Sequence, residues 1–144
     1  TPAPAATVLA ADAVAPFGAR LAAAAIDVAV LAGIATAVVA FTLRMAELSF
    51  AQVAVLPVVP MLAFLALIAL GYEWLFTAAG GQTIGKMLTG LRVVSDAGLE
   101  RPSPRQSMVR AVSLLPLGAG LVTAVAQPGL ALHDRVAHTR VVRV

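Results

Sequence analysis

The chain has 144 residues, of which 60% are hydrophobic and 12% are charged, well below the roughly 25% of charged residues in an average soluble domain. A soluble chain of this length could not bury so much apolar surface, so the composition excludes an ordinary soluble protein and predicts an integral membrane protein with one small domain. The net charge of +3 does not indicate nucleic-acid binding, because most basic residues follow the second hydrophobic stretch instead of forming a stripe, and the lack of cysteine excludes disulfides and thiolate metal sites.

The first part of the chain is a tail rich in alanine and proline. It carries Asp12 and has no basic segment, unlike a signal peptide, and its composition by itself favours disorder. We expect residues 1–15 to form an extended N-terminal tail and residues 16–144 to form a single membrane domain.

Two uncharged hydrophobic stretches after the tail are long enough to cross a membrane. They cover residues 28–43 and 53–72, and a transmembrane helix needs roughly 20 apolar residues. The first stretch reaches that length once the residues before it, two of them charged, are included. We therefore predict two transmembrane helices, at about 17–43 and 53–77.

A third hydrophobic stretch, residues 111–132, is interrupted by proline and glycine, which disrupt helical hydrogen bonding. We predict a helical segment at about 104–126 that either crosses as one kinked span or enters and returns with its turn at 116–120. Crossing would place four basic residues outside and six inside, whereas returning would place one outside and nine inside. The positive-inside rule favours the second arrangement. The expected fold class is an all-α membrane protein with two firm transmembrane helices and a re-entrant third segment; the kinked span is the alternative.

Two short valine-rich runs flank the third stretch, at residues 91–94 and 139–142. Runs of β-branched residues bounded by loop residues are typical of strands. The two runs could pair as a small sheet at the cytoplasmic surface, but only if both lie on the same side of the membrane. Otherwise their similarity is a coincidence of composition.

Arg20 and Asp27 are charged residues within the first predicted helix. They are seven positions apart, which is two helical turns, and therefore share one face. An aspartate near the middle of a membrane helix costs roughly 2.5–3.5 kcal/mol on insertion scales and needs a partner or a wet cavity. Two interpretations stay open: an ion or proton site, or a buried pair in which Asp27 is held by Arg20 or by Arg110 of the third segment.

Four further charged residues could form ion pairs or contact lipid headgroups: Glu73, Lys86, Arg110 and Arg135. Tyr72 and Trp74, on either side of the first of these, are typical of a membrane–water interface. The sequence thus predicts that the second span ends near this point.

The segment from Gly80 to Lys86 resembles the first seven positions of a phosphate-binding P-loop. The next residue is Met87, where that loop needs serine or threonine for magnesium, and the preceding element is a membrane helix and not a strand. We therefore expect no nucleotide to bind. The segment is either a tight turn or a contact for an anionic lipid headgroup.

The remaining polar residues indicate neither a metal site nor an enzyme. His133, Asp134 and His138 have a spacing that matches no common ligand set, and a polar capping turn with Asp134 paired to an arginine is the simpler interpretation. No serine has a histidine partner that would suggest nucleophilic catalysis. We expect no cofactor and no catalytic activity.

Small residues recur at every fourth position of the first helix, at Ala25, Ala29, Gly33 and Ala37. Such a ridge lets another helix approach closely. A protein with so few helices has little internal use for this ridge, so we expect an intermolecular contact there.

Four segments of the chain together resemble the RDD family, which is named for one arginine and two aspartates: residues 20–27, 81–86, 90–94 and 132–142. The resemblance covers about residues 16–142 and implies that the naming residues are Arg20, Asp27 and Asp134. The chain departs from the family at His138, where glycine is common, and at Ile84, where proline is common. The family implies a small bacterial multi-pass membrane protein without a settled function, although some members are linked to ion or solute transport.

We expect an accessory subunit of a larger bacterial membrane complex, for example of the respiratory chain, because the chain is small and offers a packing ridge. Its partners would be the lipid bilayer, other membrane subunits contacted through the first helix and the tail, and anionic lipid, but neither nucleic acid nor nucleotide. The alternative is an ion or small-solute transporter that uses Arg20, Asp27 and Asp134 and works as an oligomer, since three segments cannot enclose a pathway. The basic residues predict an inner-membrane protein with the N-terminus and the 78–105 loop in the cytoplasm.

Overall fold

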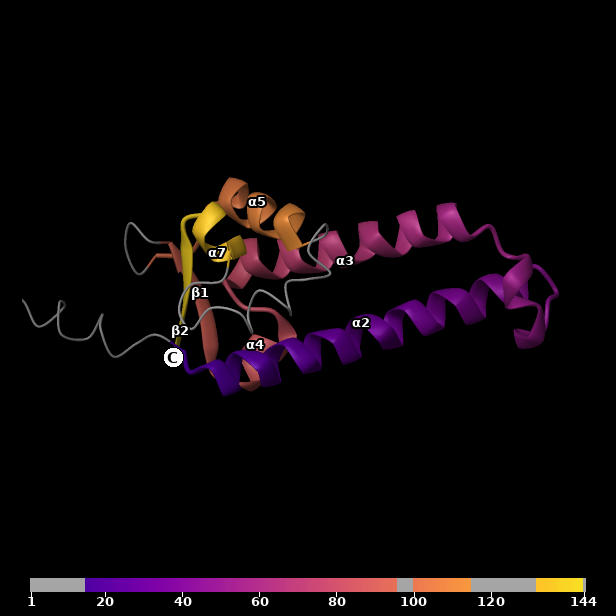
Figure 1. Cartoon of the computed structure of the whole chain (residues 1–144), viewed down its shortest axis with the longest axis horizontal. Helices are drawn as coiled ribbons and strands as arrows, with labels where there is room; N and C mark the ends of the chain where they lie inside the picture. Colours follow the sequence, from indigo (N-terminus) through magenta and orange to yellow (C-terminus); the bar gives the residue numbers. More distant parts are fainter. Residues whose placement is uncertain (1–14, 96–99, 115–131, 144) are drawn as a thin grey trace, which may run out of the picture.

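Two long apolar helices run along most of the length of the protein, and the shorter elements gather at one end of them (Figure 1). The computed structural model describes residues 15–95, 100–114 and 132–143. Helix α2 (Phe17–Met45) and helix α3 (Val58–Gly80) are joined through a short 3-10 helix, η1 (Phe50–Val55). A rise of 1.5 Å per residue makes α2 about 43 Å long and α3 about 35 Å long, so each exceeds the ~30 Å hydrocarbon core of a bilayer.

Both helices have the length and hydropathy of a membrane span, as the sequence predicted. α3 begins at Val58, later than predicted, because Pro57 holds the preceding Leu56 in an extended conformation with ψ 141°. At its other end α3 continues to Gly80. It stops where Gly81 takes a left-handed conformation, with φ +69°, which glycine adopts without steric cost.

The shorter elements form what we call the head: α4 (Ile84–Leu88), β1 (Leu91–Ser95), α5 (Pro104–Leu114), α7 (Leu132–Val136) and β2 (Thr139–Arg143). The head lies at the end where α2 begins and α3 stops (Figure 1). α4 packs against α2, α5 packs against α3, and α7 packs against both α5 and β2. α5 begins where the third helical segment was predicted to begin.

β1 and β2 pair antiparallel, with Val93 opposite Val141 at the centre. The predicted pairing of 91–94 with 139–142 is confirmed. The third segment beyond Leu114, and with it the choice between a kinked span and a re-entrant one, lies outside the described residues. The predicted turn at 116–120 lies outside the described residues.

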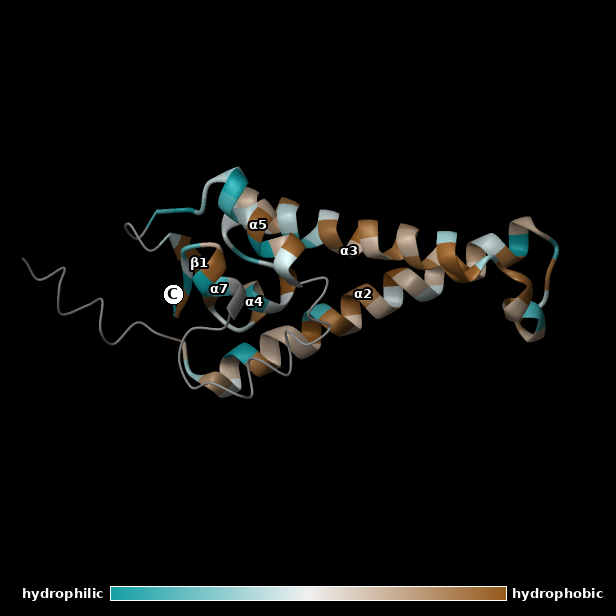
Figure 2. Ribbon diagram, turned by 45° about the horizontal axis from the view of Figure 1, so that its top comes forward, coloured by the Kyte–Doolittle hydropathy of each residue, from teal (hydrophilic) through white to brown (hydrophobic). Residues whose placement is uncertain are grey.

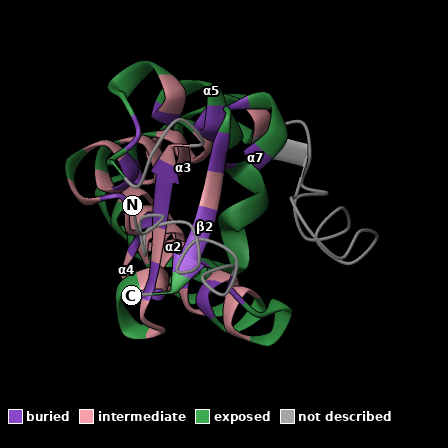
Figure 3. Cartoon of the chain, turned by 90° about the vertical axis from the view of Figure 1, so that its left-hand side faces the viewer, coloured by how far each residue is buried: buried purple, intermediate pink, exposed green. Residues whose placement is uncertain are grey.

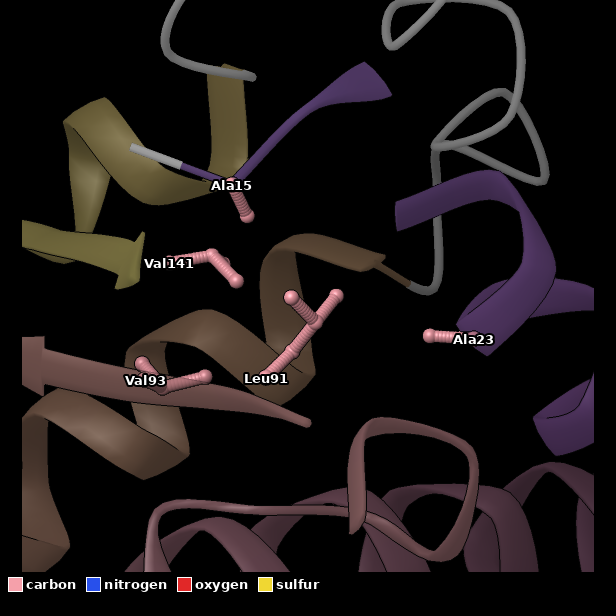
Figure 4. Close-up of a cluster of buried hydrophobic side chains, with 5 residues drawn as sticks. All are labelled: Ala15, Ala23, Leu91, Val93 and Val141. Carbon is pink, nitrogen blue, oxygen red and sulfur yellow. The ribbon is translucent and has the colours of Figure 1, made fainter. Parts of the chain in front are cut away.

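The apolar core is small and lies between the sheet and the first turns of α2 (Figure 4). It consists of five buried residues: Ala15, Ala23, Leu91, Val93 and Val141. The backbone N–H of Ala15 donates to the carbonyl oxygen of Val141 at 3.2 Å. The chain just before α2 is therefore attached to the edge of the sheet; the rest of the predicted tail lies outside the described residues.

The two long helices bury few of their residues: Ala23, Asp27 and Leu43 in α2, and Tyr72 and Thr77 in α3. Among the described elements, α2 packs mainly against α4 and α3 mainly against α5, while a hydrogen bond from Tyr72 to Asp27 joins the two long helices. Apolar residues dominate both helices along their length (Figure 2), whereas buried positions concentrate in the strands of the head (Figure 3). Such apolar surfaces need lipid or other helices to cover them, because water solvates them poorly.

Candidate functional site

Asp27 of α2 faces the head, and its buried carboxylate accepts several hydrogen bonds. Only 5% of the residue is exposed. The hydroxyl of Tyr72 and the backbone N–H of Gly85 donate to Oδ1 at 2.6 and 2.8 Å, and the hydroxyl of Thr83 donates to Oδ2 at 2.5 Å. The ammonium of Lys86 lies 3.8 Å from Oδ2 and supplies the opposite charge. One carboxylate thus joins α2, α3 and the segment that opens α4.

A glycine allows α4 to approach α2 this closely. A Cβ on Gly85 would lie 2.0 Å from the carbonyl oxygen of Ala23 and 2.9 Å from Cγ of Asp27, which is closer than carbon atoms can come. Gly81 begins the turn that brings this segment back to α2, and its carbonyl oxygen accepts a 2.6 Å bond from the N–H of Val93 in β1. Residues 81–86 therefore cradle a carboxylate of their own chain, although their composition resembles a phosphate loop.

Asp134 of α7 is completely buried and joins two arginines. Its Oδ2 pairs with Nη2 of Arg20 in α2, and its Oδ1 pairs with Nη1 of Arg110 in α5. The same nitrogen of Arg110 lies 3.4 Å from the hydroxyl of Thr139 in β2. This second carboxylate therefore ties the start of α2 to the far side of the head.

The predicted pairing of Asp27 with Arg20 or Arg110 is wrong. Both arginines pair with Asp134, and Lys86 is the charged partner of Asp27. The physical reason is that long side chains on a helix lean toward its N-terminus, so Arg20 leans away from Asp27. The arginine extends across to α7 instead.

The formal charges of this network cancel: Arg20, Lys86 and Arg110 against Asp27, Glu73 and Asp134. Burial lowers the pKa of Lys86 from its usual value, while the negative charges of Glu73 and Asp27 raise it. Burial also lowers the pKa of Arg110, to about 10, which leaves this arginine charged at neutral pH. A network without net charge avoids the largest penalty of placing ions at low dielectric.

Several polar atoms of α3 and α5 are buried and have no hydrogen-bond partner among the described residues: Oε2 of Glu73, Oγ1 of Thr77, Oγ of Ser107 and Nε of Arg110. The first two side chains are one turn apart on α3, the other two are one turn apart on α5, and the two helices pack together. Buried polar atoms of this kind are normally satisfied by ordered water or a bound group.

The other predicted site residues lie on the surface. Arg135 of α7 is exposed, and so is every residue of the predicted ridge: Ala25, Ala29, Gly33 and Ala37. A Cβ on Gly33 would have nothing within 4 Å. The ridge therefore has no partner helix among the described elements.

Three residues of the network did not stand out in the sequence. Tyr72 has the residue type and the sequence position of an interfacial aromatic residue, yet its hydroxyl donates to Asp27. Thr83 and Gly85 belong to the motif at 81–86, but the motif alone does not identify the carboxylate that they bind. Within the described residues, no group of three or more histidine, aspartate and glutamate side chains could hold a metal ion.

The comparisons with known proteins agree with the motifs that the network uses. The family model described as the RDD family matches residues 14–138, a range that includes the three carboxylates and the three cations of the network. No curated protein and no solved structure shows significant similarity to the chain.

Proposed function

This chain belongs to the RDD family, and we propose that it is a non-catalytic accessory subunit of a larger bacterial membrane complex. The family and the two apolar helices indicate a membrane protein. The complexes of the respiratory chain are the first candidates to examine. The observation that carries the proposal is the open ridge of small residues on α2.

The ridge favours contact with a partner helix, because helices associate in lipid by close packing. Lipid tails are as apolar as side chains, so association rests on close packing and not on the hydrophobic effect. Small residues at every fourth position let two backbones approach, and nothing lies within 4 Å of a Cβ on Gly33. A partner helix from another subunit fits this surface.

The charged residues favour the same role, since their contacts are within the chain. Asp27 already accepts three hydrogen bonds and has Lys86 beside it, and Asp134 pairs with two arginines. Carboxylates held in this way are suited to fastening the head to the long helices. A carrier carboxylate would have to release these partners in each cycle.

The first prediction concerns the ridge. Gly33→Leu or Ala29→Leu should release the protein from its complex, because one isobutyl group prevents close approach of a partner helix. We expect at least about a tenfold loss of co-purification in mild detergent, as a loss of ~1.4 kcal/mol would give. Gly71→Leu is the matched control, since Gly71 lies on α3 and has equally open space around it.

A second candidate function is an ion or small-solute transporter that works as an oligomer. The buried oxygens of Glu73, Thr77 and Ser107, which have no hydrogen-bond partner among the described residues, favour it, because hydroxyl and carboxylate oxygens are the groups that alkali cations and protons bind. The two functions differ in one measurement on the isolated protein in liposomes. Ion flux driven by a pH or sodium gradient, and lost in Asp27→Asn, would contradict the accessory role; the accessory role predicts no flux.

We also propose that the head lies in the cytoplasm and that the loop around η1 faces outward across the inner membrane. Six arginines of the head and of the segment just before α5 form no ion pair with another described residue: Arg92, Arg101, Arg105, Arg135, Arg140 and Arg143. The opposite end carries Arg44 beside Glu47. This asymmetry has the sense of the positive-inside rule.

Single-cysteine labelling tests this orientation, because the chain has no cysteine of its own. An impermeant maleimide added to intact cells should label Glu47→Cys fully and Arg143→Cys not at all. Both variants should react after the cells are opened, which controls for access. Labelling of position 143 in intact cells would mean that the orientation is the opposite of the proposed one, or that β2 lies outside the cell.

A further inference from the structure

Helix α5 buries polar side chains and exposes large apolar ones. Ser107 and Arg110 are 1% and 3% exposed, whereas Met108 and Val112 are 44% and 50% exposed. A helix on the surface of a soluble protein shows the reverse arrangement. The exposed face of α5 is therefore suited to lipid chains and not to water.

Arginines stand at one end of this apolar face. Arg105 is exposed and shares a helical stripe with the apolar residues, at spacings of three, four and seven: Met108, Val109 and Val112. Arg101, just before α5, is also exposed, and its Nη1 donates to the carbonyl oxygen of Ala79 at 3.1 Å. Neither arginine forms an ion pair with another described residue.

The start of α5 is held against α3 at the same place. The indole N–H of Trp74 donates to the carbonyl oxygen of Pro104 at 3.1 Å, and the contact of Arg101 with Ala79 is a second link to the last part of α3. The guanidinium of Arg101 is thus held at the end of α3, and Arg105 follows in the first turn of α5, near an aromatic residue typical of the headgroup region.

We propose that this surface is a binding site for an anionic phospholipid. The lipid phosphate lies between the guanidinium groups of Arg101 and Arg105, which suit bidentate phosphate contacts, and an acyl chain lies along Met108, Val109 and Val112. The occupant is a lipid and not a protein because one stripe combines a cationic end with an apolar length, which matches an anionic amphiphile. The site requires α5 to lie in a membrane; it does not depend on the accessory role.

The only tryptophan of the chain reports on this site. The full-length protein is reconstituted into vesicles of phosphatidylcholine and phosphatidylglycerol, with bromine on the acyl chains of either lipid. At equal mole fraction we expect brominated phosphatidylglycerol to quench Trp74 fluorescence far more than brominated phosphatidylcholine. Two arginines at an anionic surface correspond to an apparent preference on the order of tenfold.

Paired variants separate a site from diffuse surface charge. The double variant Arg101→Gln with Arg105→Gln should abolish the preference for phosphatidylglycerol. The double variant Arg135→Gln with Arg143→Gln removes the same charge from other exposed positions of the head, and the preference should remain. The double variant Arg101→Lys with Arg105→Lys keeps both charges and should retain most of the preference for phosphatidylglycerol. It therefore controls for a loss of structure near Ala79.

Three outcomes would overturn the proposal. The preference for phosphatidylglycerol could fall equally in both double glutamine variants, or stay unchanged in the variant that lacks Arg101 and Arg105. The third outcome is that neither brominated lipid quenches Trp74. The last would mean that protein and not lipid covers α5. The lipid experiment uses the isolated protein, so its failure would leave the co-purification test of the accessory role unaffected. Failure of the co-purification test would likewise leave the lipid experiment unaffected.

Discussion

Replacing Asp134 by alanine is expected to destabilise the protein by about 3–5 kcal/mol. The change leaves Arg20 and Arg110 without their common counter-charge, and Arg110 is only 3% exposed. Removing one member of a buried pair is costly because the remaining charge stays at low dielectric with no compensation. Thermal unfolding of the purified protein in detergent, and its amount in the membrane, would measure the loss.

The matched control is the next residue of the same helix. Arg135 is exposed, so Arg135→Ala should change the stability by no more than about 0.5 kcal/mol. Adding Arg110→Met to Asp134→Ala should recover part of the loss, because the most deeply buried unpaired charge is then gone, and a double-mutant cycle measures that coupling. If Asp134→Ala melts like the wild type, the network does not hold the head together.

Gly85→Ala is expected to separate α4 from α2. The new methyl group would lie 2.0 Å from the carbonyl oxygen of Ala23 and 2.9 Å from Cγ of Asp27, and the first of these is backbone that cannot rotate away. The shift also breaks the bond from the N–H of Gly85 to Asp27. Overpacking together with lost bonds to a buried carboxylate should destabilise the protein by about 3 kcal/mol.

Gly80→Ala is the control for this substitution. Gly80 lies in the last turn of α3, and a Cβ there meets nothing within 4 Å, so alanine should be neutral or stabilise the helix by up to about 1 kcal/mol. Thermal unfolding of both variants under identical conditions gives the comparison. Equal melting temperatures for Gly85→Ala and Gly80→Ala would mean that α4 does not lie against α2 as described.

Hydropathy and strand propensity were sufficient to predict the main elements, because each depends on residues that are close together in the chain. Apolar runs identified α2 and α3, the first of them only when Arg20 and Asp27 were included, and two β-branched runs identified β1 and β2. The boundaries were less accurate. α3 starts at Val58 because Pro57 constrains the residue before it, an effect that hydropathy does not register.

The charged residues of the site were recognised from the sequence, and the predicted pairing of Asp134 with an arginine is confirmed, but the sequence identified neither which arginines these are nor the partner of Asp27. A charge in an apolar stretch is conspicuous, and Arg20 and Asp27 were identified in that way, whereas Asp134 was identified from its polar turn and the resemblance to the family. The partner of each depends on the directions of side chains from different elements. Arg20 meets Asp134 across 114 positions of sequence, and no local pattern encodes that distance.

The sequence by itself therefore determined that the chain has two apolar helices, a small antiparallel sheet and the signature of its family. Composition and short-range periodicity carry that information, since helices and strands form from neighbouring residues. Only the tertiary structure decided that Lys86 lies beside Asp27, that Asp134 pairs with two arginines, and that α5 buries polar side chains and exposes apolar ones. Those choices follow from which buried charges can reach one another, because at low dielectric each must find an opposite charge or a donor.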